Sequence, residues 1–330
     1  TILKHDIMAD VDEQKSNKHR RIENKDSASP NKHHLRALGF CGADDSSPPE
    51  LLAALSARYN YIEWGVLFRD ELQGTPRYAS QAWLDRLGEV NADRAMLLAA
   101  HLCSTRCTQV LNGDSSFVAS LHDKYGFKRF QVNATAANNV DMGGVNKEGA
   151  ARLRSVMVAL PHVEFILQRN EETKPLWQAL ESGEGGELGL PLPPNVSFLF
   201  DESKGTGVVA AEWPSPPPGV GRFFGYAGGL GPTTLEAQLP RMAARMSESS
   251  KQGEGEVRGN GDSGAGATGR DFWVDMESSL RTIVVETGSG EEEGSNNTRR
   301  DTFDVCKCVA AVRIVEAAAR AGVLAMPAAR

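Results

Sequence analysis

The chain has no long apolar run and no excess of basic residues. No segment approaches the roughly 18 apolar residues that a membrane-spanning helix requires, so we expect no membrane partner. Lys and Arg together number 36 against 43 Asp and Glu, which gives a net charge of -7. Binding to the phosphate backbone of nucleic acid requires a basic surface. The acidic balance therefore argues against nucleic acid as the main partner.

Cysteine is scarce as well, with five residues scattered over 330 positions. An odd number at irregular spacing does not form a disulfide framework and is typical of a reducing compartment, so we expect a cytoplasmic protein. The spacings Cys103-x3-Cys107 and Cys306-x-Cys308 differ from the Cys-x2-Cys pair of a zinc site. We therefore expect no metal site.

Three segments lack the apolar residues that a folded core needs. Residues 1–34 are mostly charged, Asn and Ser, and we expect them to form a disordered tail. Residues 247–269 and about 287–300 are rich in Ser, Gly and Glu, which is typical of flexible insertions. Without the tail and the insertions, the domain at 35–330 has on the order of 250 residues, the usual size of a single (β/α)8 barrel.

Short β-rich runs alternate with helical patterns over this domain. The expected strands are 35–41, 61–68, 95–100, 128–133, 163–167, 196–200, 222–227 and 272–277. The expected helices are 48–58, 80–89, 115–125, 147–160, 172–182, 233–246 and 303–322. Such alternation indicates a parallel sheet, and eight units of this size favour a closed TIM barrel over an open doubly wound sheet. No Gly-x-Gly-x-x-Gly follows the first strand, which weakens the dinucleotide-binding alternative.

Reactive side chains stand where the expected strands end, and such barrels carry their active sites at the C-terminal ends of the strands. Cys41 ends the first strand, Arg77 follows the second, and Asp201 ends the sixth. His101, at the end of the third strand, is a candidate second acid or base, or a substrate-binding group. Each has a structural alternative: a buried thiol, a solvated arginine, an aspartate that caps a turn, or a hydrogen-bonded histidine.

Glycine and serine cluster in the loops after the last three strands. In these barrels the loops after strands 7 and 8 commonly hold phosphate, because glycines let backbone N–H groups approach the oxygens. The residues that we expect to bind phosphate or substrate are Gly205, Thr206, Gly207, Gly228, Gly229, Asp275, Ser278 and Ser279. Asp275 would either contact a ribose hydroxyl or have a purely structural role. We therefore expect a small phosphorylated sugar as the partner.

Taken in order along the chain, these motifs resemble the phosphoribosylanthranilate isomerase family of tryptophan biosynthesis. That family carries Lys-x-Cys-Gly in strand 1, Ser-Pro-Arg-Tyr after strand 2, Asp ending strand 6, a Gly-Thr-Gly loop, Ala-Gly-Gly-Leu in strand 7 and Val-Asp-x-Ser-Ser-Gly in strand 8. The counterparts here are Cys41-Gly42, Thr75-Pro76-Arg77-Tyr78, Asp201, Gly205-Thr206-Gly207, Ala227-Gly228-Gly229-Leu230, and Val274-Asp275 with Ser278. The resemblance covers nearly the whole expected barrel.

The resemblance implies an isomerase that performs an Amadori rearrangement of an N-phosphoribosyl aromatic amine without a cofactor. An acid protonates the ring oxygen to open the sugar, and a base removes the C2 proton to give the enol. It implies Cys41 as the base, Asp201 as the acid and Arg77 as the clamp for the anthranilate carboxylate. A thiol becomes a usable base if a nearby cation or helix dipole lowers its pKa. We expect a monomer or a homodimer.

The chain departs from the family at four positions near the strand ends. They are Gly39 where the family has Lys, Asn133 where it has the strand-4 His, Ser279 in place of the strand-8 Gly, and Arg281 in place of the acidic residue that follows. Two alternatives stay open. One is a lyase or epimerase that acts on another sugar phosphate through Asp201 and His101. The other is a barrel that binds a phosphorylated ligand without catalysis, against which the joint retention of Cys41, Arg77 and Asp201 argues.

Overall fold

The computed structural model describes residues 33–141, 147–181, 192–201, 207–216, 223–253, 271–286 and 298–327. All of them belong to one unit of the chain, residues 31–330. Of the expected tail, only His33 and His34 lie within the described residues, and His34 is already the first residue of strand β1. The reason is backbone pairing, because Ala325 donates to the carbonyl of His33 and accepts from the N–H of Leu35. The first strand therefore begins at His34, one residue before the expected boundary.

Eight parallel strands close into a barrel in the order of the sequence. They are β1 (His34–Cys41), β2 (Ile62–Phe68), β3 (Leu97–Leu102), β4 (Arg129–Val132), β5 (Glu164–Arg169), β6 (Val196–Asp201), β7 (Phe224–Ala227) and β8 (Asp271–Met276). The first and last strands complete the ring, with Gly39 paired to Asp275. The predicted (β/α)8 barrel is confirmed, and every expected strand overlaps an observed one.

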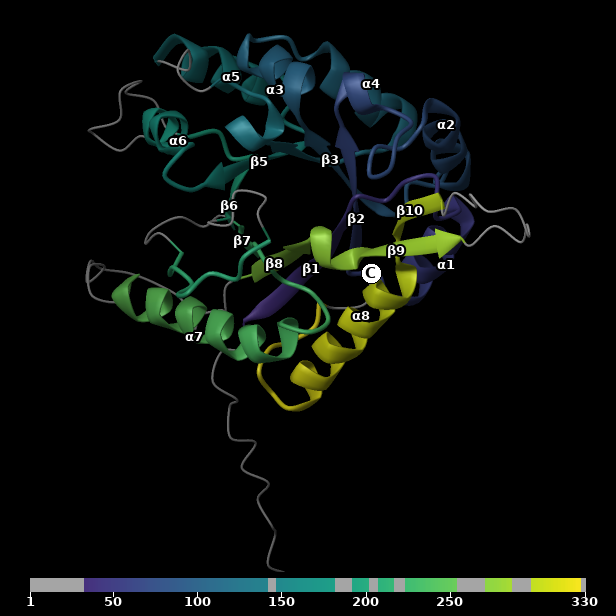
Figure 1. Cartoon of the computed structure of the whole chain (residues 1–330). Helices are drawn as coiled ribbons and strands as arrows, with labels where there is room; N and C mark the ends of the chain where they lie inside the picture. Colours follow the sequence, from purple (N-terminus) through teal and green to yellow (C-terminus); the bar gives the residue numbers. More distant parts are fainter. Residues whose placement is uncertain are drawn as a thin grey trace, which may run out of the picture. The chain divides into compact units, whose positions relative to one another are not determined.

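The helices lie outside the strands, as Figure 1 shows. They are α1 (Pro49–Arg58), α2 (Gln81–Val90), α3 (Ser104–Leu111), α4 (Ser116–Tyr125), α5 (Lys147–Ala159), α6 (Lys174–Leu180), α7 (Leu235–Gly253) and α8 (Val305–Arg320). The sequence does not predict α3, because Ser, Thr and Cys are weak helix formers. Its buried face of Cys107, Val110 and Leu111 stabilises it instead. Within the described part of the chain, no helix is both long and apolar enough to span a bilayer.

Helix α7 corrects one of the expected insertions. Residues 247–253, which the sequence analysis assigns to a flexible loop, continue the helix to Gly253. Adding a residue to an existing helix is easier than starting one, and Glu, Lys and Gln are good helix formers. The polar composition of this segment is therefore compatible with a helix, while residues 254–270 lie outside the described residues.

A hairpin that the sequence analysis does not predict follows β8. Strands β9 (Arg281–Glu286) and β10 (Thr298–Phe303) pair antiparallel, with Arg281 opposite Phe303. The predicted C-terminal boundary of the insertion at 287–300 is therefore wrong, since β10 begins at Thr298. The hairpin lies beside α1 and α8 in Figure 1. It is fastened there because Phe303 donates its backbone N–H to Ser46 Oγ and accepts from Ser47 Oγ.

The interior of the barrel is filled in its middle layer by one large ring. Trp273 packs with Ala37, Ile166 and Leu199. Its indole lies over Gly225 on the neighbouring strand, where a Cβ atom would collide with the ring. A glycine is needed at this position because the ring occupies the space of a side chain. The indole lies 4.3 Å from Arg129 of a charged layer at the N-terminal end of the barrel, and its neighbours Leu199 and Ala227 line a cavity at the C-terminal end.

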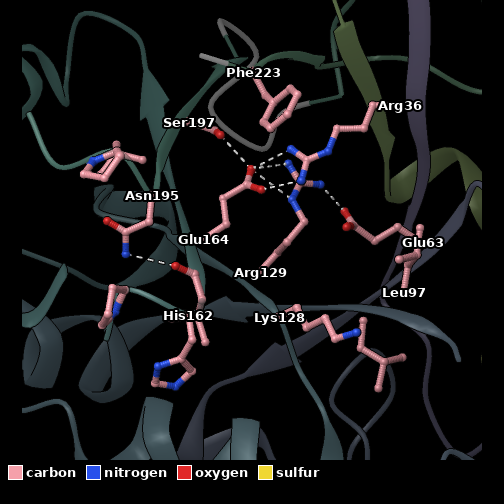
Figure 2. A pocket seen from close by; sticks show the side chains of 15 residues that line it. Arg36, Glu63, Leu97, Lys128, Arg129, His162, Glu164, Asn195, Ser197 and Phe223 are labelled. Atoms are coloured by element: carbon pink, nitrogen blue, oxygen red, sulfur yellow. Dashed lines mark hydrogen bonds and ion pairs between the residues drawn. The ribbon is translucent and has the colours of Figure 1, made fainter. Parts of the chain in front are cut away.

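That charged layer is an ion-pair network beside a cavity of about 380 Å³ (Figure 2). Arg129 is buried and lies 2.6 Å from Glu63 and 3.1 Å from Glu164, with its guanidinium 4.3 Å from the Trp273 ring. Arg36 holds the same Glu164 through both terminal nitrogens. Burial opposes the charge on Glu164, but Arg129 and Arg36 outweigh it and lower its pKa to about 2. Because these buried charges are paired, we expect the network to stabilise the folded barrel.

Candidate active site

A cavity of about 590 Å³ opens at the C-terminal ends of the strands. Its polar lining includes side chains that lie within or just after the barrel strands: His101, Gln131, Asn133, Gln168, Asp201, Asp275, Glu277, Ser278 and Ser279. Gly207 and the glycines after β7 also line it. Most of the substrate-binding residues predicted from the sequence therefore meet in one place. The described lining carries three carboxyl groups and no Lys or Arg side chain.

Cys41 lies behind the cavity wall instead of in it. The thiol is buried, with 1% of the residue exposed, and its Sγ lies 3.2 Å from Nδ1 of His101. His101 lines the cavity, so it stands between Cys41 and any bound substrate. The two side chains meet across Gly65 of β2, where a Cβ atom would lie 2.9 Å from both the Cys41 Cα and the His101 Nε2.

The condition under which Cys41 would be a usable base, a lowered thiol pKa, is not met. Burial raises the pKa of the thiol well above its ordinary value, and the nearby carboxylates of Glu277 and Asp275 raise it further. Arg77 opposes this rise but is outweighed. Burial likewise lowers the pKa of His101, to about 3, with a contribution from the positive charge of Arg129. Both side chains are therefore neutral near pH 7.

Asp201 ends β6 and faces the cavity, as the sequence predicts. Gln168 on β5 approaches it, with Nε2 at 3.4 Å from Asp201 Oδ2. The Gln168 carboxamide is buried, and its Oε1 has no hydrogen-bond partner among the described residues. Since an unpaired buried carbonyl is costly, this oxygen is suited to accept a hydroxyl or amine hydrogen from a ligand.

Two further carboxyl groups come from the end of β8, where alternate residues of the strand face the barrel interior. Asp275 occupies the space beside Gly39, since a Cβ atom there would lie 2.6 Å from Asp275 Oδ1. Burial raises its pKa well above the ordinary value, helped by the charges of Glu63 and Glu277. Burial also raises the pKa of Glu277, although Arg77 opposes the rise. The period of two along the strand is the signal that would have found Glu277 in the sequence.

The Arg77 guanidinium pairs with protein carboxylates, and Arg77 itself does not line the cavity. Its Nε lies 3.2 Å from Asp301 of the hairpin, and its Nη1 lies 3.3 Å from Glu277. Its backbone has a positive φ of 77° and donates to Asp44. Arg281 shares these partners, because it bonds Asp44 and Asp301 and is buried. Clamping a substrate carboxylate would therefore require Arg77 to leave its present partners.

The glycine-rich loops approach one another closely at the rim. Gly228 and Gly229 have φ of 103° and 62°, in the region that favours glycine, and a Cβ atom on Gly229 would collide with the backbone of Val209. Ser278 begins a short 3-10 helix, Ser278–Leu280, and lines the cavity. Ser279 donates its hydroxyl to the Leu230 carbonyl at 2.5 Å, so this side chain joins the two loops. Gly205 and Thr206 lie outside the described residues.

Comparisons with known proteins do not assign a family. No family model matches the chain, and no curated protein matches it. Among solved structures, phosphoribosyl anthranilate isomerase from Thermococcus kodakaraensis is 15% identical, covers 85% of this chain and 99% of its own, and has a TM-score of 0.35. A truncated form of 3-deoxy-D-arabino-heptulosonate 7-phosphate synthase from Thermotoga maritima is 10% identical, covers 90% of this chain and 91% of its own, and has a TM-score of 0.41.

These similarities are too low to bear on the reaction. The barrel itself rests on the closed strand order of this chain. Among the described residues, no group of three or more His, Cys, Asp or Glu side chains is arranged to hold a metal ion. The chemistry that this cavity can perform therefore depends on its acids, its histidine and its carboxamides.

Proposed function

We propose that the chain is an acid/base isomerase that performs an Amadori rearrangement of an N-phosphoribosyl aromatic amine. The observation that carries the proposal is the arrangement of Asp201 and Glu277 around one cavity whose rim holds the Gly228-Gly229 loop and Ser278. Two carboxyl groups supply the acid and the base that an aldose-to-ketose conversion needs. The glycine loops supply backbone N–H groups for the phosphate.

Asp201 is the proposed general acid. It protonates the ring oxygen of the sugar, which opens the ring as the nitrogen lone pair forms the C1–N double bond. Gln168 lies beside it, and the unpaired Oε1 of Gln168 is available to a sugar hydroxyl. This carboxamide would orient the sugar against the acid.

Glu277 is the proposed base for the proton at C2. The resemblance implies Cys41 for this step, but Cys41 is a buried thiol separated from the cavity by His101. Glu277 lines the cavity, and burial raises its pKa, which makes its carboxylate a stronger base. We therefore assign the proton abstraction to Glu277.

The test is turnover of phosphoribosylanthranilate and of the corresponding aniline conjugate by purified protein. We expect saturable conversion of at least one substrate. Asp201→Asn and Glu277→Gln should each lower kcat by about 10²–10⁴-fold, as loss of a general acid or base does. Glu71→Gln is the matched control, because Glu71 pairs with Arg69 and does not line the cavity. Turnover that survives Asp201→Asn contradicts the assignment.

A second candidate function is a lyase or epimerase that acts on a different sugar phosphate. One observation favours it: His101 lines the cavity whereas Cys41 does not. Asp201 and His101 would then be the reacting pair. Conversion of simple pentose phosphates, with no conversion of either amine conjugate, would select this function.

A further inference from the structure

Cys41, Gly65 and His101 form a contact that spans three neighbouring strands. Cys41 pairs with Gly65 in the β1–β2 register, and His101 lies on the next strand. The imidazole reaches the thiol across the bare backbone of Gly65, which gives the 3.2 Å contact between Sγ and Nδ1. A Cβ atom at residue 65 would lie 2.9 Å from His101 Nε2 and 3.1 Å from Cys41 Cβ, so only glycine permits this contact.

The hydrogen bond in this contact can run in one effective direction. Burial raises the pKa of Cys41 well above its ordinary value, so the hydrogen stays on the sulfur. Burial also lowers the pKa of His101 to about 3, so the imidazole is neutral and carries one hydrogen. A thiol donates S–H, and an unprotonated imidazole nitrogen is the better acceptor. Nδ1 therefore accepts from Cys41, and the ring hydrogen lies on Nε2.

The Nε2–H group is then free to serve a ligand. Among the described residues, the His101 ring has its hydrogen bond at Nδ1 only, and the side chain lines the cavity. A neutral imidazole donor stabilises an oxygen that gains negative charge without itself losing its proton. Loss of the C2 proton sends its electron pair toward the C1–N double bond and leaves an enol. The C2 oxygen then gains negative charge when the enol hydroxyl gives up its proton and C1 is protonated to form the ketose.

We propose that His101 is a catalytic residue that presents a fixed Nε2–H donor to the C2 oxygen of the substrate, and that Cys41 is a positioning residue that fixes this tautomer across Gly65. The identity of the substrate oxygen rests on the proposed function. The tautomer and its dependence on Cys41 do not, so the two can fail separately. No bond to His101 forms or breaks in this role.

The first experiment reads the tautomer directly, by NMR of the 15N-labelled full chain near pH 7, with the His101 signals assigned from their absence in His101→Gln. We expect a protonated Nε2 and an unprotonated Nδ1 in the unmodified protein. Cys41→Ala should shift the Nδ1 resonance and populate the other tautomer. Cys308→Ala is the matched control, since this buried thiol lies on α8 and donates to the Asp304 carbonyl. A hydrogen on Nδ1 in the unmodified protein overturns the proposal, whatever the activity.

The second experiment separates donation from packing. His101→Gln keeps an N–H donor on a side chain of similar reach, whereas His101→Leu removes it. We expect His101→Leu to lower kcat by about 10²–10³-fold, as loss of a preorganised donor does, and His101→Gln to be at least tenfold faster than His101→Leu. Stabilisation by inorganic phosphate should be equal in both variants. Equal kcat in the Gln and Leu variants, both folded by melting temperature, overturns the catalytic role.

Discussion

The Arg77 guanidinium lies 3.3 Å from Glu277 Oε1, at the edge of the cavity that Glu277 lines. Burial raises the pKa of Glu277, and the charge of Arg77 opposes that rise. Arg77→Met removes the opposing charge, so the pKa of Glu277 should rise further. On acidification, the Glu277 carboxylate should then become protonated at a higher pH than in the unmodified protein. We expect the rising limb of the kcat/KM pH profile to move to higher pH.

The control for this shift is Arg69→Met, because Arg69 pairs with Glu71 and neither residue lines the cavity. Its pH profile should match that of the unmodified protein. An unmoved limb in Arg77→Met would remove the support for Glu277 as the base.

Inorganic phosphate should raise the melting temperature if the loops after β7 and β8 hold a phosphate group. Ser278 is exposed at this rim and lines the cavity. Ser278→Asp places a negative charge there, so we expect it to abolish the shift at millimolar phosphate. Substituting Gly229 is a poorer test, because its positive φ and its closeness to Val209 would distort the loop itself.

Ser120→Asp serves as the control for charge alone, since Ser120 is exposed on α4, away from the cavity. It should keep the phosphate-induced shift. The absence of any shift in the unmodified protein would count against a phosphate site at this rim.

The sequence predicts the barrel well because its signal is repeated: eight apolar runs alternate with helical patterns, and each local unit agrees with the whole. The rim residues that follow strands, such as Asp201 and Gly228, are predictable for the same reason, since strand ends of one barrel share one face. The contact of Cys41 with His101 is not predictable from either residue. The contact depends on the absence of a side chain at Gly65. The importance of that glycine becomes clear only once the three strands are known to be neighbours.

The pKa values of the side chains at the site were the property that the sequence predicted least well. A lowered thiol pKa at Cys41 would need a nearby cation, and Arg77 is the candidate. Arg77 instead forms ion pairs with Glu277 and with Asp301 of the unexpected hairpin. Burial of the thiol then decides the direction of its pKa. Burial and charge pairing depend on distances between elements far apart in the chain, which the spacing of residues within one element does not contain.

The ion-pair network at the N-terminal end of the barrel should be important for stability. Arg129→Met removes the shared partner of Glu63 and Glu164 and leaves buried carboxylates with fewer compensating charges. We expect a loss of about 3–5 kcal/mol in the free energy of unfolding, measured by urea titration. Arg86→Met, which breaks exposed pairs with Glu50 and Glu89, should change it by less than about 1 kcal/mol. Equal losses in the two variants would show that the network adds no more than surface pairs do.

The same network should make stability depend on acid in a defined range. Burial opposes the charge on Glu164, but Arg129 and Arg36 lower its pKa to about 2, below the unfolded value near 4.3. As the pH falls, Glu164 therefore becomes protonated at a lower pH in the folded state than in the unfolded state. The contribution is complete above about pH 4.5 and is lost as the pH falls toward 2. The free energy of unfolding should fall less steeply over this range in Glu164→Gln than in the unmodified protein, whereas Glu89→Gln, at an exposed pair, should keep nearly the original slope. An unchanged slope in Glu164→Gln would mean that Glu164 titrates alike in the folded and unfolded chain, contrary to its pairing with two arginines.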